Sequence, residues 1–265
     1  MVSRAQEASA FDAVARDYDR TFTFTTLGRM LRARVWEHLA EHFKAGERVL
    51  DLACGTGEDA VWLAQRGVRV AAADASGAML DIARAKAAQA GVGGKISFLR
   101  ASIKQIAHGA VPGRFDGAFS NFGGINTARD LSALVRRLYL DLKPRGKLIL
   151  VPMSRLCPLE ILTFLAGGNI RQALRRQRLN PVAEIRGRKI PIYFPSGRDL
   201  RRQTASGFKL LSVESLGFWL PPTDFGHWVD AWPRLFSLVN QFDRATSSMM
   251  GASGDHFIFI AERKP

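Results

Sequence analysis

Short apolar runs and longer amphipathic stretches follow one another regularly between about residue 46 and residue 153. The apolar runs have the length of buried strands, and the stretches between them have the spacing of helices that bury one face. The predicted strands are residues 48–53, 68–74, 96–101, 115–121 and 147–153; the predicted helices are residues 58–66, 76–90 and 129–143, with a turn at 144–146. This order is typical of βαβ units around a parallel sheet.

The regular pattern ends after residue 153. Residues 154–195 combine apolar and basic helical stretches without a complete strand–helix unit, and residues 219–253 are rich in Trp, Phe and Pro. A helix after Ser196, a sixth strand at 208–218 and a last strand at 256–263 complete the prediction. We expect four segments: an N-terminal cap of two helices (1–45), a cofactor-binding core (46–153), a basic and apolar lid insertion (154–195), and a C-terminal part of the core (196–265) with an aromatic insertion at 219–253.

The composition is that of a globular protein, since 47% of the 265 residues are hydrophobic and 23% are charged. Two cysteines, Cys54 and Cys157, are too few for a disulfide framework in a chain of this length, which favours a reducing compartment. The most apolar segment, residues 156–168, is shorter than a membrane span and contains Glu160. The N-terminal residues mix charges of both signs and lack the apolar centre of a signal peptide. We therefore expect a cytoplasmic protein without a transmembrane segment.

Positive charge is in large excess and is concentrated in one part of the chain. The 38 Lys and Arg residues outnumber the 24 Asp and Glu residues, which gives a formal net charge of +14. Most of this excess lies between residues 155 and 209, and it favours contact with nucleic acid, an anionic membrane surface or an acidic substrate. The most basic run, residues 171–189, contains no aromatic side chain for base stacking. Nucleic acid is therefore possible but not favoured, and a plain solvated surface is the alternative.

The most informative stretch is VLDLACGTGEDA, residues 49–60. A strand ends near Asp51, Gly55 and Gly57 turn the chain, and a helix then begins with free N–H groups. Such a turn is typical of a site for a nucleotide-like ligand. Asp74 ends the next strand, where a carboxylate can accept both hydroxyls of a ribose. The alternatives are a plain tight turn for the glycines and a helix N-cap for Asp74.

The ligand of this turn is not expected to be a dinucleotide. A dinucleotide fingerprint has a third glycine at the position where this chain has Ala60. A carboxylate at Asp51 would repel a pyrophosphate, but it suits a ligand with a cationic amino group. Both observations favour an adenosyl amino acid.

The segments DLACGTGED (51–59) and AAADASGAMLDIARAK (71–86) resemble the class I S-adenosylmethionine-dependent methyltransferases, in particular the bacterial small-molecule group related to the ubiquinone/menaquinone methyltransferases. The resemblance implies a Rossmann-like, doubly wound α/β sheet of seven strands with the last strand antiparallel. It also implies transfer of a methyl group from S-adenosylmethionine to a small or lipid-like organic substrate, at oxygen, nitrogen or carbon, with release of S-adenosylhomocysteine and without a metal. An RNA methyltransferase and a cofactor-binding partner protein without turnover are the alternatives.

The resemblance also implies which residues bind the cofactor. Asp51 would lie near the amino group of the methionine part, Asp74 would hold the ribose, and Asn121, in FSNFGGIN (119–126), would lie beside the sulfonium. The other candidates are Ala53, Gly55 and Gly57 along the glycine turn, Ala75 and Met79 beside the adenine, Tyr18 in the N-terminal segment FDAVARDYD, and Ser102, which stands where the family often has Asp for the adenine amino group.

A hydroxyl acceptor would need a general base, and His227 and His256 are the best candidates. Both lie in segments that the seven-stranded topology brings to the ligand-binding end of the sheet. A buried structural histidine is the alternative for each. The insertions after strands five and six emerge at the same edge, so we expect an aromatic lid with a basic margin over an anionic or apolar small-molecule substrate.

Overall fold

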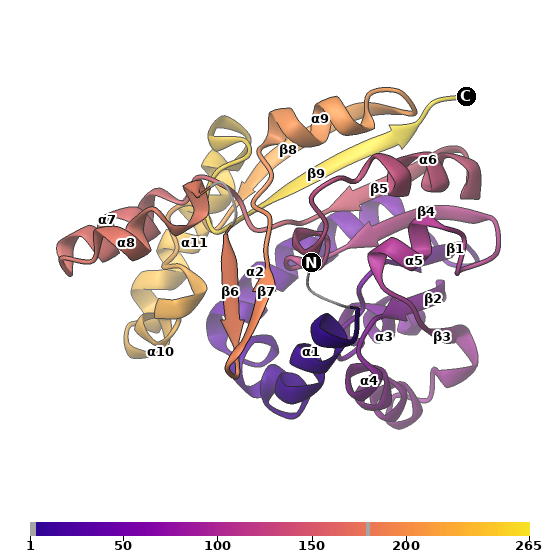
Figure 1. Cartoon of the computed structure of the whole chain (residues 1–265), viewed down its shortest axis with the longest axis horizontal. Helices are drawn as coiled ribbons and strands as arrows, with labels where there is room; N and C mark the ends of the chain where they lie inside the picture. The colour runs from indigo at the N-terminus through magenta and orange to yellow at the C-terminus, as the bar shows by residue number, and fades with distance from the viewer. Residues whose placement is uncertain (1–3, 179–180) are drawn as a thin grey trace.

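A seven-stranded sheet forms the centre of the computed structural model, which describes residues 4–178 and 181–265 (Figure 1). The strand order is β3-β2-β1-β4-β5-β9-β8. The strands are β1 (Arg48–Asp51), β2 (Arg69–Asp74), β3 (Ile96–Arg100), β4 (Phe115–Ser120), β5 (Leu142–Leu150), β8 (Phe208–Leu216) and β9 (His256–Arg263). The first five pair in parallel, whereas β9 lies between β5 and β8 and runs antiparallel to both. The predicted doubly wound fold with an antiparallel last strand is confirmed.

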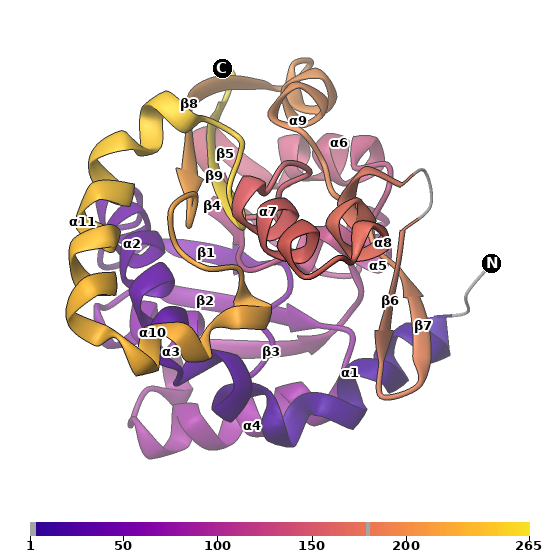
Figure 2. The same ribbon diagram turned by 90° about the vertical axis from the view of Figure 1, so that its left-hand side faces the viewer.

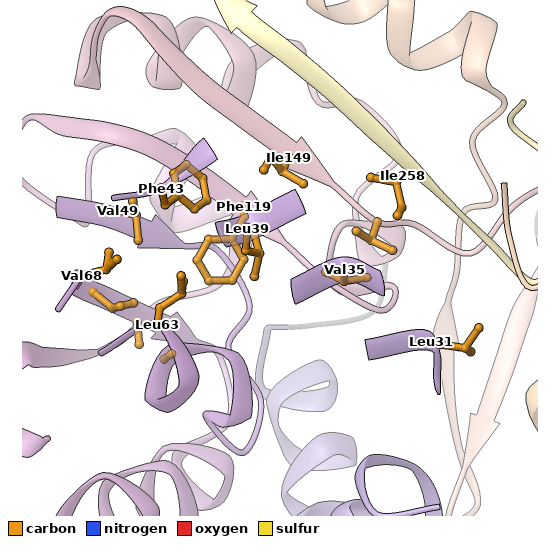
Figure 3. Close-up of a cluster of buried hydrophobic side chains, with 14 of the residues drawn as sticks. Leu31, Val35, Leu39, Phe43, Val49, Leu63, Val68, Phe119, Ile149 and Ile258 are labelled. Carbon is orange, nitrogen blue, oxygen red and sulfur yellow. The ribbon is translucent and has the colours of Figure 1, made fainter. Parts of the chain in front are cut away.

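The central strands are buried on both faces, so neighbouring residues of one strand pack into two different clusters. In β1, Val49 belongs to one cluster and Leu50 to the other; in β4 the same holds for Phe119 and Ala118. Figure 3 shows the first cluster, to which α2 (Thr26–His42), α3 (Glu58–Gln65), α4 (Gly77–Gln89) and α11 (Pro233–Met250) contribute side chains. The second cluster receives side chains from α5 (Ile103–Ala107), α6 (Ser132–Asp141) and α9 (Gly197–Thr204).

The turn predicted at residues 144–146 lies inside strand β5. Phe115 pairs with Leu142 and Gly117 pairs with Lys147, so the residues between Leu142 and Lys147 bulge out of β5. Within this bulge Arg145 has a φ of 64°. The predicted helix 129–143 is shorter in the structure because Leu142 is already extended.

The N-terminal part consists of α1 (Arg4–Tyr18), a π-helical turn (Asp19–Thr23) and α2. Residues 1–3 of the predicted cap lie outside the described residues, as do residues 179–180 of the predicted lid. In Figure 1, α1 lies beside α4, with which it is in contact. The two helices predicted for this segment are present, and the π-helical turn between them ends at Thr23, before the extended N-cap residue Thr25.

The lid segment contains α7 (Pro158–Ala166), α8 (Ile170–Ala173) and a hairpin that was not predicted, made of β6 (Val182–Ile185) and β7 (Arg188–Pro191). Its two-residue turn, Arg186-Gly187, has positive φ at both positions, as tight hairpins require. The hairpin lies beside α1 in Figure 2, and Arg186 Nη2 is 2.6 Å from Asp17 Oδ2. The aromatic insertion forms α10 (His227–Ala231) and α11. Within the described ranges, no helix combines the length and hydropathy that a membrane crossing needs.

Candidate functional site

The carboxyl ends of β1, β2 and β4 open into a cavity beneath α1, which we call the cofactor cavity. Its lining brings together eight of the residues predicted to bind the cofactor: Tyr18, Ala53, Gly55, Asp74, Ala75, Met79, Ser102 and Asn121. Phe11, Ile103, Phe122, Gly124 and Thr127 complete much of the wall. Residues that are distant in the sequence meet here because the strand ends of a parallel sheet share one edge.

The two glycines of the turn have different surroundings. Gly55 has a φ of 52°, and a Cβ added to it would meet no atom within 4 Å, so the space beside it is open. Gly57 has a φ of 79° and precedes α3, but a Cβ there would lie 2.6 Å from the Cβ of Ala83 on α4. Gly57 is not part of the cavity lining. Its role in this structure is the close approach of two helices, whereas only Gly55 borders the cavity.

Asp74 connects two turns of the chain. Its carboxylate accepts the N–H of Gly55 at 2.8 Å and the N–H of Ser76 at 2.9 Å. The N-cap of α4 is Ser76, whose hydroxyl accepts the N–H of Met79, so the N-cap alternative for Asp74 is wrong. Burial raises the pKa of Asp74 above its ordinary value.

Asp51 lies beneath the cavity rather than in its wall. It is buried, and the N–H of Ala53 donates to it at 3.4 Å. Burial, with the nearby charge of Asp59, raises the pKa of Asp51 well above the ordinary value. A cationic group bound next to Asp51 would offset this cost of burying a carboxylate.

Arg32 and Asp59 are site residues that the sequence did not indicate. Asp59 accepts hydrogen bonds from Arg32 Nη1 (2.6 Å), Trp36 Nε1 (2.7 Å) and Asn121 Nδ2 (2.9 Å). A small hollow next to the cofactor cavity is lined by Arg32, Asp59, Tyr18 and Asn121. Nε of Arg32 and Oδ1 of Asn121 are buried there without a partner among the described residues. A charged donor and an amide acceptor therefore remain available to a ligand.

The N-terminal cap is fixed to the cofactor turns by two carboxylates. Asp12 accepts the hydroxyl of Ser76 at 2.5 Å and the N–H of Ala78 at 3.1 Å. Asp19 accepts the hydroxyl of Thr56 and pairs with Lys86 Nζ, both at 2.7 Å. Tyr18 is thereby held over the cavity, and burial raises its pKa to about 12, so its phenol is neutral at physiological pH.

Ser102 lines the cavity, but its hydroxyl is already engaged. It is the N-cap of α5 and accepts the N–H of Gln105 at 3.4 Å, while the Gln105 side chain accepts the N–H of Ser102 at 3.0 Å. This capping box stabilises the start of α5. The geometry gives Ser102 a structural role in addition to its place in the wall.

The two candidate bases have different positions. His227 is the first residue of α10, where it is exposed and outside the lining of the cofactor cavity. His256 is buried, with its ring centroid 5.5 Å from that of Phe122 in the cavity wall. Its Nδ1 is 3.4 Å from Asp255 Oδ2 and makes no hydrogen bond in the described part of the chain. His256 thus lies one side chain behind the cavity.

A buried ion network joins the lid to β9. Nη2 of Arg176 lies 2.5 Å from Glu160 Oε2 and 2.6 Å from Asp255 Oδ1. Burial raises the pKa of Asp255, but His256 and Arg176 outweigh it and hold this pKa below the ordinary value. Cys157, Glu160 and Asp255 lie close enough together to hold a metal ion. The guanidinium of Arg176, however, already supplies the positive charge between the two carboxylates.

Residues 49–146 match the family model of a methyltransferase domain. This part of the chain is a methyltransferase domain. This domain comprises β1 to the bulge of β5, and it includes the glycine turn, Asp74 and Asn121. The family predicted from the two sequence motifs is confirmed.

Curated proteins that are similar in sequence to this chain include demethylmenaquinone methyltransferases. The protein of Clavibacter sepedonicus is 34% identical over 149 residues, which are 56% of this chain and 58% of that protein. The protein of Thermus thermophilus is 36% identical over 146 residues, which are 53% of this chain and 63% of that protein. The chain therefore spans about three fifths of the length of these relatives.

Solved methyltransferase structures share the fold over nearly the whole chain. A DhpI–S-adenosylhomocysteine complex has a TM-score of 0.62 at 17% identity, and the match covers 99% of this chain and 97% of that one. An S-adenosylmethionine dependent methyltransferase from Mesorhizobium loti has a TM-score of 0.55 at 20% identity, covering 86% and 97%. The likeness in fold thus extends beyond the matched domain into the lid and C-terminal segments.

Proposed function

We propose that this protein binds S-adenosylmethionine in the cofactor cavity and transfers its methyl group to a small organic acceptor, releasing S-adenosylhomocysteine. The observation that carries this proposal is the assembly of the open glycine turn at Gly55, the ribose-type acid Asp74 and the amide of Asn121 around one cavity. The names of the curated relatives support a lipid-like quinone as one class of acceptor.

The residues present fit an adenosyl amino acid. The unpartnered Nε of Arg32 suits the carboxylate of the methionine part, and buried Asp51 suits its ammonium. Asp74 can exchange its contact with Gly55 for ribose hydroxyls. The adenine would lie between Ala75, Met79 and Ile103. Each part of the ligand thereby meets a group of matching polarity.

The contribution of the chain to the reaction is mainly alignment and exclusion of water. The bound cofactor supplies a methyl group on a cationic sulfur, which is reactive toward a nucleophile placed in line with it. Two aromatic rings line the cofactor cavity, those of Tyr18 and Phe122. The ring of Phe22 packs against both, with its centroid 5.1 Å from that of Phe122. Holding the reactants in line lowers the barrier by up to about 7–11 kcal/mol. Neither candidate base lines the cavity: His227 is exposed on α10, and His256 is buried behind Phe122.

Calorimetric titration with S-adenosylmethionine and S-adenosylhomocysteine tests the binding part of the proposal, with NADH as the control ligand. We expect micromolar binding of the two adenosyl ligands and none of NADH. Transfer of a labelled methyl group into fractions of a cell extract then tests turnover. A folded protein that binds neither adenosyl ligand would contradict the proposed function.

A further inference from the structure

A second pocket lies next to the cofactor cavity, and we call it the arginine pocket. Its lining includes four exposed arginines, two aromatic residues and one carboxylate, which are Arg129, Arg155, Arg178, Arg202, Tyr193, Phe194 and Asp199. Arg176 also contributes to the lining, but Glu160 and Asp255 neutralise it. The charge of the pocket is therefore strongly positive.

The positive charge of the arginine pocket is not balanced from within. In the described part of the chain, Arg129, Arg155 and Arg178 form no ion pair, and Arg202 Nη2 is 3.5 Å from Asp199 Oδ1. Asp199 also accepts the hydroxyl of Ser196 at 2.6 Å as part of a helix cap. Guanidinium groups around one hollow repel one another, and an oxyanion between them would replace this repulsion with bidentate hydrogen bonds.

Aromatic rings orient part of the lining. The guanidinium carbon of Arg129 lies 5.3 Å from the ring centroid of Tyr193, and that of Arg176 lies 5.4 Å from Phe194. Such contacts restrict the freedom of long side chains before a ligand arrives. The phenolic oxygen of Tyr193 is buried and has no hydrogen-bond partner among the described residues. The pocket therefore combines a restrained cation, Arg129, with the unpartnered hydroxyl of Tyr193.

One short helical turn, Gly124–Thr127, separates the two hollows. Gly124 and Thr127 line the cofactor cavity, whereas Ile125 and Ala128 line the arginine pocket. Asn126 fixes this wall, because its backbone carbonyl accepts the N–H of Tyr193 at 2.7 Å and its side chain accepts the N–H of Met153 at 3.0 Å. The pocket and the cavity are therefore held in a constant relation to each other.

We propose that the arginine pocket binds a phosphate-type oxyanion carried by the methyl acceptor. The oxyanion anchors one end of the acceptor, and its reactive end reaches the cofactor cavity past the turn Gly124–Thr127. This inference rests on the proposed function, since it assigns the ligand of the pocket to the same reaction. The shared chemistry fits a soluble phosphorylated molecule and a lipid with a phosphate headgroup alike, and it differs from a plain quinone, which carries no such oxyanion.

Three probes test the proposal by titration: inorganic phosphate, hexyl phosphate, and vesicles of neutral lipid containing phosphatidylglycerol. The test variant is Arg129→Gln/Arg202→Gln, which removes two exposed cations from the pocket. The matched control, Arg69→Gln/Arg114→Gln, removes the same charge at the start of β2 and before β4, at the opposite edge of the sheet. Affinity for S-adenosylhomocysteine and thermal unfolding are measured on all three proteins.

We expect the test variant to bind at least one probe about tenfold or more weakly than the unmodified protein, while the control changes by less than twofold. Loss of binding to the soluble phosphates assigns the pocket to a soluble acceptor, and loss confined to vesicles assigns it to a headgroup. Equal affinity of the test variant and the unmodified protein for every probe would overturn the proposal. Failure of S-adenosylhomocysteine binding in the unmodified protein would instead overturn the proposed function and leave an Arg129- and Arg202-dependent phosphate site standing.

Discussion

Asp74 holds two turns with one carboxylate, and this explains why a single residue matters for the whole cavity. Its oxygens accept the N–H groups of Gly55 and Ser76, which belong to different turns. We expect Asp74→Asn to weaken binding of S-adenosylhomocysteine by about 10- to 100-fold. An amide has only one acceptor oxygen, so one N–H or one ribose hydroxyl loses a charge-assisted bond. Calorimetric titration measures the change.

The matched control for this prediction is Asp81→Asn. Asp81 lies on the exposed face of α4, where it pairs with Arg84. The same chemical change there should leave the affinity unaltered. An unchanged affinity in Asp74→Asn as well would remove Asp74 from the proposed ribose contacts.

Asp51 is buried without a strong partner, so its charge costs stability in the ligand-free protein. Because its pKa is raised in the folded state, the carboxyl is neutral in both states at low pH and is charged at a cost at high pH. We expect Asp51→Asn to raise the melting temperature at pH 7.5, by about 2–4 °C for each kcal/mol by which the free energy of unfolding increases. At pH 4 the increase in melting temperature should be smaller. The same variant should bind S-adenosylhomocysteine more weakly. A gain that is larger at pH 4 than at pH 7.5 would contradict this account.

At the residue scale, the sequence indicated Gly55 and Asp74 of the cavity wall but not the pair Arg32 and Asp59. Gly55 and Asp74 stand at strand ends, where the chain order alone indicates the binding edge. Arg32 is one of three arginines in α2, and cations in an amphipathic helix are typically solvated. Only the packing of α2 against α3 brings it to Asp59.

At the scale of elements, Gly57 sets the distance between the start of α3 and α4. Alanine at this position would meet the Cβ of Ala83 at 2.6 Å and would also keep an unfavourable positive φ. We expect Gly57→Ala to lower the free energy of unfolding by about 1–3 kcal/mol more than a substitution that adds only the backbone strain. Urea unfolding measures the difference.

Gly91→Ala separates strain from overlap, because Gly91 has a φ of 68° and nothing within 4 Å of an added Cβ. Gly91→Ala should therefore lower the free energy of unfolding by less than Gly57→Ala does. Gly57→Ala/Ala83→Gly should recover part of the loss through the vacated space. Equal costs for Gly57→Ala and Gly91→Ala would exclude the contact with Ala83 as the cause.

Strands buried on both faces were predicted within a few residues, whereas the lid hairpin was missed. Val49 and Leu50 pack to opposite faces, so the run that contains them is apolar throughout and easily recognised. The hairpin strands β6 and β7 have four residues each and are largely exposed, with basic side chains among them. The main sequence signal for a hairpin was the Arg186-Gly187 pair between two short runs. This signal is weak because nothing in the sequence shows what the hairpin packs against.

At the scale of the whole molecule, Arg176 joins the lid segment to β9 through Glu160 and Asp255. Its removal leaves buried Asp255 without an arginine partner, whereas Glu160 keeps Arg175 at 2.8 Å. We expect Arg176→Met to lower the free energy of unfolding by about 3–5 kcal/mol at pH 7.5, measured by urea unfolding. The deficit should shrink as the pH falls toward 5, because protonation of Asp255 then relieves the charge that Arg176 no longer compensates.

Arg171→Met is the matched control, since Arg171 is exposed at the start of the same basic run. It should change the stability by less than about 0.5 kcal/mol. A deficit of Arg176→Met that stays constant with pH would indicate lost packing rather than unpaired charge.

The position of β9 between β5 and β8 also has a consequence for synthesis. Within the described sheet β8 pairs only with β9, so β8 cannot join until residues 256–263 have emerged from the ribosome. Until then β5 presents an open edge, and an open edge can pair with the wrong chain. The nascent protein is therefore exposed to aggregation during the time needed to make the roughly one hundred residues that separate β5 from β9. A factor that shields this edge during translation would raise the yield of folded protein more than one that acts after release.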